Sequence, residues 1–243
     1  LWHLGYAEEA LKVNREMLEL GRSIEHPFSL AYALHHTSWL YQYLRLPTDA
    51  LAASGEQIRF AADQGFPLFH ATGIVYEAAA LLLRGHAKAS LPGLIKGLDA
   101  YRGTGAALAL PYYFGLLGNA LIDSKRLKDA DNALNKALAV AEESRERCHE
   151  AELHRLKGEI ALSAGRGPDR AEVHFRRAIE IAKAQQSKAL ELRSVTSLAR
   201  LYLEQNRTSE AQARLSEALA KFTQGFETPD LQAASALLAE LRN

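Results

Sequence analysis

Hydrophobic and polar positions alternate along this chain with the period of an α-helix, and the helical segments recur about every 40 residues. Helix-favouring residues dominate and runs of β-branched residues are absent, so the pattern predicts an all-α protein. Pro27, Pro67 and Pro229 stand where helices are expected to start, because the first turn of a helix tolerates a missing amide hydrogen. The predicted helices span residues 7–24, 28–44, 48–64, 68–84, 87–102, 110–124, 127–145, 148–163, 169–185, 188–205, 208–223 and 230–242.

A pair of small side chains recurs with the same period. The pairs are Ser38 with Ala50, Ala78 with Ser90, Gly118 with Ala130, Gly158 with Ala171, and Ala199 with Ala211. Their members lie 12 residues apart, or 13 in the fourth pair, where the loop 165–169 accommodates one more residue. Small side chains at both places let two antiparallel helices approach closely. The spacing therefore predicts an α-solenoid of about five to six helix pairs that winds as a right-handed superhelix.

The same spacing divides the chain into repeats of a single array. We expect a partial repeat at 1–26, then repeats at 27–66, 67–106, 107–147, 148–187 and 188–227, and a capping helix in 228–243. Ala10 lies 40 residues before Ala50, so the chain is expected to open inside a repeat and to be a fragment of a larger protein. Leu231, Leu237, Leu238 and Leu241 form the apolar face that a terminal cap requires.

Composition narrows the possible partners. Lys plus Arg equals Asp plus Glu at 29 each, which argues against direct binding of nucleic acid. Cys148 is the single cysteine, which excludes a disulfide framework and suits a reducing cytoplasm. The uncharged stretch Gly103–Ile122 contains four glycines and a proline, so it is interpreted as a loop and a buried helix rather than a membrane span.

Candidate chemistry is sparse. No phosphate-binding P-loop occurs, and acidic residues are dispersed along amphipathic helices. His149 and His154 are five residues apart, which separates them by about 140° around a helix, and the adjacent His35 and His36 diverge as well. Cys148 has no evident base partner in the sequence and is interpreted as a bystander thiol. We therefore predict no catalytic, cofactor-binding or metal-binding residues, and no enzymatic activity for this region.

The first helices of the repeats supply the predicted binding surface. In the helix 28–44, Leu34, Ser38 and Tyr41 are placed against the paired helix, and an aromatic stripe runs on the opposite side. The position of Tyr32 is held in later repeats by Thr72, Tyr112, Glu152 and Arg193, and that of Trp39 by Ala79, Asn119, Glu159 and Arg200. Because these positions become polar and charged, we expect them to face solvent. The candidate concave surface comprises Tyr32, His36, Trp39, Tyr43, Tyr76, Tyr112, Asn119, Glu152, Arg193 and Arg200.

The two halves of the chain differ in composition. Residues 1–122 hold 15 of the 19 aromatic residues but 19 of the 58 charged ones. One interpretation is a groove for a protein or peptide, lined by aromatic side chains and extended by a polar floor. The alternative is that the aromatic side chains pack between successive repeats. The sequence leaves both open.

Leu134, Phe175 and Leu215 follow the second small residue by four positions, and Ala137, Ala178 and Ala218 follow it by seven. This pattern resembles the tetratricopeptide repeat (TPR), although its period is near 40 rather than the usual value of about 34. The strings His26–Leu34, Glu150–Glu159, Leu190–Arg200 and Gly225–Leu231 further resemble the carboxy-terminal repeats of bacterial proteins that combine a class III adenylate or guanylate cyclase domain with a P-loop ATPase module.

That resemblance implies a cytoplasmic, non-catalytic signalling region. Its partner would be a protein or peptide, including the upstream ATPase and cyclase domains of the same chain, and neither nucleic acid nor a membrane is expected. The alternative is the scaffold region of a bacterial ATPase-type transcription regulator. The sequence does not identify the oligomeric state.

Overall fold

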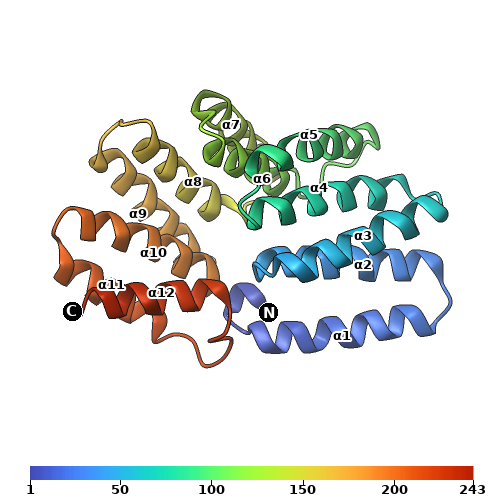
Figure 1. The fold of residues 1–243 in the computed structure, drawn as a ribbon, viewed down its shortest axis with the longest axis horizontal. Coiled ribbons are helices and arrows are strands. Elements are labelled where there is room, and N and C mark those ends of the chain that lie inside the picture. The colour runs from blue at the N-terminus through green and yellow to red at the C-terminus, as the bar shows by residue number, and fades with distance from the viewer. Residues whose placement is uncertain (243) are drawn as a thin grey trace. The chain divides into compact units, whose positions relative to one another are not determined.

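The computed structural model describes residues 1–242, which are helices joined by short turns (Figure 1). The elements are η1 (Trp2–Leu4), a 3-10 helix, followed by α1 (Ala7–Ser23), α2 (Pro27–Tyr43), α3 (Pro47–Asp63), α4 (Pro67–Leu83), α5 (Ala87–Gly103), α6 (Leu110–Asp123), α7 (Leu127–Ser144), α8 (Glu150–Ser163), α9 (Pro168–Ala184), α10 (Lys188–Glu204), α11 (Thr208–Leu219) and α12 (Pro229–Glu240). The all-α prediction is confirmed. Asn243, the last residue of the predicted capping segment 228–243, lies outside the described residues.

Most predicted helix boundaries agree with the structure to within two residues. The largest difference is at α11, which ends at Leu219 rather than at residue 223. Turns follow it, and Gly225 there adopts a left-handed backbone with φ of 77°. The short helix η1 was not predicted.

The contacts between residues divide the chain into two compact units. Unit 1 contains Leu1–Ala7 and Leu110–Asn243, and unit 2 contains Glu8–Ala109. In unit 2, the helix pairs α2/α3 and α4/α5 pack together, and α4 also contacts α2 and α3. In unit 1, the pairs are α6/α7, α8/α9 and α10/α11, with α8 in contact with both α6 and α10.

The predicted small residues lie at the helix–helix contacts. All ten are buried. A Cβ atom added to Gly118 would lie 2.5 Å from Cδ2 of Leu134, and one added to Gly158 would lie 2.4 Å from Cε1 of Phe175. The glycine thus makes room for the larger side chain that follows the second small residue by four positions. The extra residue of the fourth pair is in the α8–α9 turn, between Ser163 and Pro168, as predicted.

Helix α12 packs on α10 and α11, and these three helices lie side by side in Figure 1. Leu231, Leu237, Leu238 and Leu241 are all buried, so the predicted apolar face is confirmed. They join a core cluster that includes Phe175 from α9. Within residues 1–242, no helix is both long and apolar enough to cross a membrane.

Candidate binding surface

Four aromatic side chains form a continuous row along α2. The row comprises Tyr32, His36, Trp39 and Tyr43 and is called the aromatic row below. Ring centroids are separated by 4.1 Å between Tyr32 and His36, 6.0 Å between His36 and Trp39, and 5.8 Å between Trp39 and Tyr43. Tyr32 is 50% exposed, and the other three are half-buried. The residues are four, three and four positions apart, which keeps them on one side of the helix.

A buried layer supports the aromatic row from α4. The Tyr76 ring stacks on Trp39, with a centroid distance of 6.4 Å and an interplanar angle of 27°. Gln42 Nε2 donates to the Tyr76 carbonyl oxygen at 2.8 Å, which ties α2 to α4. The buried His35 forms a 3.0 Å hydrogen bond with Thr72 Oγ1. Burial lowers the pKa of His35 to about 3, so its ring is uncharged at neutral pH.

The structure corrects one predicted surface residue. Tyr76 is fully buried, and so are Thr72 and Ala79, which hold the positions of Tyr32 and Trp39 in the next repeat. Helix α4 packs against α2, α3 and α5. These neighbours cover the face of α4 that corresponds to the face of α2 bearing the aromatic row. Equivalent positions in successive repeats therefore differ in exposure, and Tyr76 belongs to the core.

The predicted polar residues lie in unit 1, where Glu152 and Arg193 form intramolecular ion pairs. Glu152 accepts hydrogen bonds of 2.7 and 2.9 Å from the guanidinium of Arg155. Glu159 accepts from Arg155 at 2.9 Å and from Ser197 Oγ at 2.8 Å. Burial opposes the charge of Arg155, but the two carboxylates outweigh it and raise the pKa of Arg155. This network joins α8 to α10.

Arg193 is held on both sides within unit 1. Its Nε donates to Asp230 Oδ2 at 2.7 Å, and its guanidinium carbon lies 4.8 Å from the ring centroid of the buried Trp2. The sequence predicted a solvent-facing Arg193, but its side chain is only 10% exposed, and neither of its two neighbours was predicted. Both are distant in sequence, so no local spacing could have identified them.

The ten predicted residues divide equally between the units. Tyr32, His36, Trp39, Tyr43 and Tyr76 belong to unit 2, and Tyr112, Asn119, Glu152, Arg193 and Arg200 belong to unit 1. Arg200 is exposed, whereas Tyr112 and Asn119 are half-buried. The Tyr112 ring lies 4.7 Å from the ring of His149.

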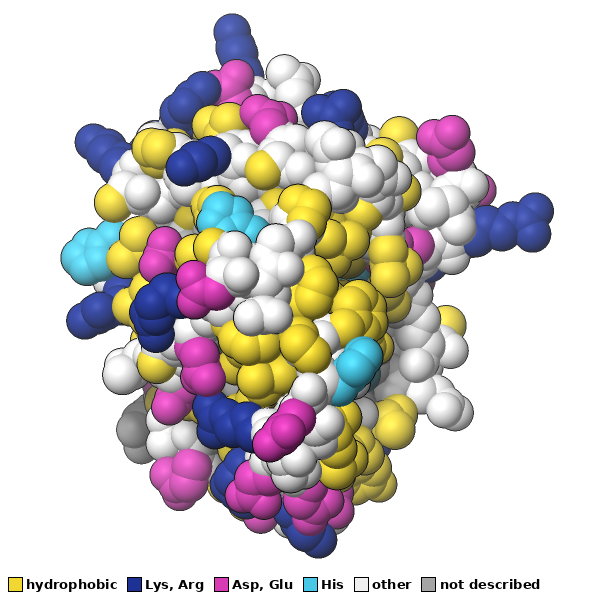
Figure 2. All heavy atoms as spheres, turned by 90° about the vertical axis from the view of Figure 1, so that its right-hand side faces the viewer, with side chains coloured by type: hydrophobic (Ala, Val, Ile, Leu, Met, Phe, Trp, Pro, Cys, Tyr) yellow, Lys and Arg dark blue, Asp and Glu magenta, His cyan; other side chains and the backbone are white. Residues whose placement is uncertain are grey.

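A second apolar surface of unit 2 was not predicted. Phe28, at the start of α2, is 53% exposed, and its ring lies 6.1 Å from that of Phe66 and 5.5 Å from that of Phe69. Figure 2 shows hydrophobic side chains gathered on the side of the molecule where the α1–α2 and α3–α4 turns lie. The sequence signal for this surface is a phenylalanine next to each of the helix-starting residues Pro27 and Pro67.

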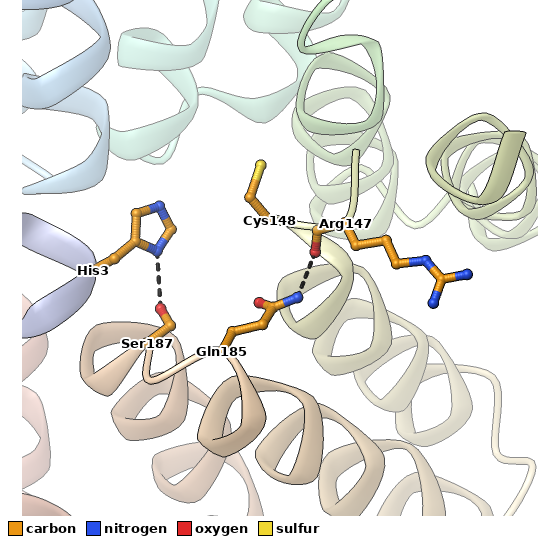
Figure 3. A pocket seen from close by; sticks show the side chains of 5 residues that line it. All are labelled: His3, Arg147, Cys148, Gln185 and Ser187. Atoms are coloured by element: carbon orange, nitrogen blue, oxygen red, sulfur yellow. Dashed lines mark hydrogen bonds between the residues drawn. The ribbon is translucent and has the colours of Figure 1, made fainter. Parts of the chain in front are cut away.

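Unit 1 also contains a pocket of about 290 Å³ formed by loop residues (Figure 3). Its lining residues are His3, Arg147, Cys148, Gln185 and Ser187. His3 Nδ1 lies 2.9 Å from Ser187 Oγ, and Gln185 Nε2 donates to the Arg147 carbonyl oxygen at 2.8 Å. The α7–α8 and α9–α10 loops and η1 thus meet at one place.

Cys148 has a hydrogen-bonding neighbour in His149, which the sequence does not reveal. Its Sγ lies 3.1 Å from Nδ1 of His149, the N-cap residue of α8. Partial desolvation of the exposed Cys148 raises the pKa of its thiol, and burial lowers the pKa of His149 to about 3. Burial also lowers the pKa of His3 to about 4. At neutral pH the thiol is protonated and both imidazoles are uncharged, which is not the arrangement of an activated cysteine nucleophile.

Comparison with known proteins supports the fold class. No family model matches the chain. A stretch of 148 residues is 30% identical to the Uncharacterized protein R02095 of Rhizobium meliloti (strain 1021), and the match covers 61% of this chain and 13% of that protein. The chain thus spans a small part of this much longer relative.

Three solved structures show the same architecture. Aspartyl phosphate phosphatase F from Bacillus subtilis matches with a TM-score of 0.65 and 13% identity, covering 94% of this chain and 62% of that chain. A Rap protein complexed with competence and sporulation factor matches with a TM-score of 0.61 and 16% identity, covering 94% and 67%. A Podosopora anserina protein with nearly identical TPR-like repeats matches with a TM-score of 0.54 and 18% identity, covering 81% and 96%.

These likenesses define the class of the protein. The fold is that of TPR-like helical-repeat proteins, which confirms the predicted resemblance at the level of architecture. At these identities the likeness concerns the fold alone, and a fold does not specify an activity. The association with a cyclase stays a prediction.

Proposed function

We propose that this chain is a non-catalytic interaction region that binds a protein or peptide, with the aromatic row as its principal contact surface. The observation that carries the proposal is the continuous row of four rings on α2, of which Tyr32 is half exposed. Tyrosine and tryptophan offer large contact areas and lose little conformational entropy on binding. Because Tyr76, His35 and Gln42 fix the row from below, it is preorganised for a ligand.

The surface of unit 1 is proposed to add polar specificity. Glu152 and Arg193 are oriented by Arg155 and Asp230, so their side chains are already ordered before a ligand arrives. Arg200 is exposed and available to a charged partner. The similar Rap structure, complexed with competence and sporulation factor, supports the view that this architecture accommodates a partner.

Selection of peptides from a displayed random library tests the proposal. Peptides enriched on the purified chain are expected to bind the Tyr32→Ala/Tyr43→Ala variant about tenfold or more weakly, since each lost anchor costs over about 1 kcal/mol. Ile95→Ala is the matched control, because Ile95 is 44% exposed on the second helix α5. Fluorescence of Trp39, measured in a Trp2→Phe background, should change as a peptide binds. Binding unaffected by the double substitution would disprove the proposal.

We further propose that this region is the sensory or scaffold part of a larger bacterial cyclase signalling protein. The strings that resemble such proteins support the cyclase setting, and the relative of which the chain matches 13% supports a place in a longer protein. The upstream sequence discriminates between the alternatives. Cyclase carboxylates and a P-loop there would support the proposal, whereas a helix-turn-helix would favour a transcription regulator.

A further inference from the structure

We propose that unit 1 binds a zinc-class divalent metal ion where η1 and the α7–α8 loop meet. The ligands are Glu146, Cys148 and His149, whose potential donor atoms all lie within 4.8 Å of one another. His3 lines the pocket beside Cys148 and lies outside this set of donors, so in the proposal its ring moves toward them to become the fourth ligand. This proposal departs from the sequence-based prediction that the chain holds no metal. The sequence signal for this metal site is the Glu-x-Cys-His string at residues 146–149, and not a pair of histidines on one helix.

The donor set matches zinc in number and type. Zinc is bound tetrahedrally by thiolate, imidazole and carboxylate groups, with Zn–S near 2.3 Å and Zn–N near 2.0–2.1 Å. These bond lengths place the sulfur and nitrogen donors roughly 3.5 Å apart at a tetrahedral angle. Cys148 Sγ and His149 Nδ1 are 3.1 Å apart in the structure, so a small outward movement of either side chain admits the ion. On binding, the Cys148 S–H bond breaks, the sulfur keeps the electron pair and donates it to the metal, and the proton leaves to solvent.

His3 has the orientation of a metal-ligating histidine. Its Nδ1 lies 2.9 Å from Ser187 Oγ, and in the tautomer that donates this hydrogen bond the lone pair is on Nε2. Metal-ligating histidines commonly use their second nitrogen in such a bond. Figure 3 shows Nδ1 of His3 directed to Ser187, with the remaining ring nitrogen and the Cys148 sulfur both on the side of the pocket away from Ser187. The rings of His3 and His149 have centroids 6.1 Å apart, so His3 must approach by about 1 Å for both rings to bind one tetrahedral ion.

The local charges are compatible with a divalent cation. Two arginines approach the site, but each has a carboxylate partner of its own. Arg147 pairs with Glu142, and Arg193 pairs with Asp230 at 2.7 Å. A carboxylate at Glu146 and a thiolate at Cys148 supply two negative charges to the ion. Cys148 is exposed, which provides a path for entry from solvent. The bound metal would fasten η1 to the loop before α8, and thereby stabilise unit 1.

Cobalt(II) is the spectroscopic probe for this site. Co²⁺ added to the purified, reduced chain is expected to give thiolate-to-cobalt charge-transfer absorption that saturates at one ion per chain and disappears when Zn²⁺ is added. Cys148 is the single cysteine, so such a band reports on this residue alone. Zn²⁺ should also slow alkylation of Cys148 by a maleimide. Absence of the band, or saturation at one ion per two chains, would overturn the proposal.

Variants separate this site from binding by other histidines. Cys148→Ser should abolish the band, and His149→Ala and His3→Ala should each weaken Co²⁺ binding about tenfold or more. Ser187→Ala should weaken it about 10-fold or more through the loss of the outer hydrogen bond. His174→Ala, which alters a histidine stacked on His154 elsewhere in unit 1, is the control and should leave affinity unchanged. Thermal unfolding without metal checks that each variant folds. Equal affinity of Cys148→Ser and the parent chain would exclude the site.

Discussion

Two glycines show how a single atom decides the packing of a helix pair. Gly118 and Gly158 occupy the small position of the first helix, where Leu134 and Phe175 fill the space that a Cβ atom would need. Alanine or serine is present at the same position in the other repeats. At these two glycines, close packing of the helix pair therefore depends on both the small residue and the larger side chain opposite it.

Gly158→Ala tests this requirement. Alanine gains about 1 kcal/mol of helix propensity over glycine. The new Cβ would lie 2.4 Å from Cε1 of Phe175, and such overpacking typically costs about 1–3 kcal/mol, so we expect a net loss of stability in urea unfolding. Gly55→Ala in α3 is the matched control and should stabilise, since its Cβ meets only the flexible Arg59 at 3.4 Å. Adding Phe175→Leu to Gly158→Ala should recover part of the loss. Equal stabilisation by both alanines would contradict the argument.

His35 makes the stability of unit 2 depend on pH. Burial, followed by the neighbouring His36, lowers its pKa from 6.5 to about 3. Between these values the unfolded chain binds a proton that the folded chain does not, so stability is complete above pH 6.5 and falls as the pH decreases toward 3. The expected slope from His35 is up to about 1.4 kcal/mol per pH unit. His35→Gln, which can keep a hydrogen bond to Thr72, should show a shallower decline in urea midpoint from pH 6.5 to 5. The same decline in both proteins would refute this assignment.

At the scale of elements, the helix pairs depend on short turns with a left-handed residue. Arg45, Lys125 and Asn206 adopt φ between 54° and 61° without being glycine, and Gly85 and Gly165 take the same place in the other repeats. Each turn reverses the chain in a few residues, so the two helices of a repeat pack side by side. Helix α12 contacts both α10 and α11.

Leu231→Ala tests the covering role of α12. Leu231 is 3% exposed in the core cluster that joins α9, α10, α11 and α12. Removing its buried side chain is expected to cost about 2–5 kcal/mol and to lower the thermal midpoint. Ser235→Ala, an exposed change in the same helix, should shift stability by less than about 0.5 kcal/mol. Deleting the chain from Thr228 onward should also produce aggregation, measured by light scattering. A soluble, monodisperse truncated protein would show that α12 is not a cap.

At the scale of the whole molecule, segments far apart in sequence form unit 1. Leu1–Ala7 belongs with Leu110–Asn243. Trp2 is buried under Arg193, Lys188 Nζ lies 5.3 Å from the ring centroid of Tyr6, and a Cβ at Gly5 would meet the Phe222 ring at 3.1 Å. The first residues therefore contribute to the packing around α10, in addition to preceding α1.

Trp2→Ala should destabilise unit 1 even though the substitution is more than 100 residues from α6 along the chain. Loss of a buried tryptophan side chain costs about 3–5 kcal/mol, and Arg193 loses its aromatic neighbour. Leu1→Ala is the control, since Leu1 is 51% exposed. Amide hydrogen exchange measures the effect, with faster exchange expected in α10 than in the control protein. Exchange in α10 that is unchanged by Trp2→Ala would show that the segment does not support this unit.

The sequence predicted the part of the candidate surface that lies on a single helix. Tyr32, His36, Trp39 and Tyr43 share one side of one helix, so helical spacing alone places them in a row. Tyr76 was misplaced because its burial depends on α2, α3 and α5, which contact α4 from different directions. Trp2 next to Arg193, and His3 next to Cys148, were not predictable because these contacts cross most of the chain.

The sequence by itself determined the α-helices, most of their boundaries and the small residues at which they pair. These properties depend on periodicity, capping and side-chain volume within about 40 residues, where chain connectivity limits the alternatives. Only the tertiary structure decided which face of each first helix is covered, which residues form unit 1, and that His3 lines a pocket beside Cys148, next to Glu146 and His149. Such contacts between distant segments depend on how whole helices pack, and no single repeat contains that information.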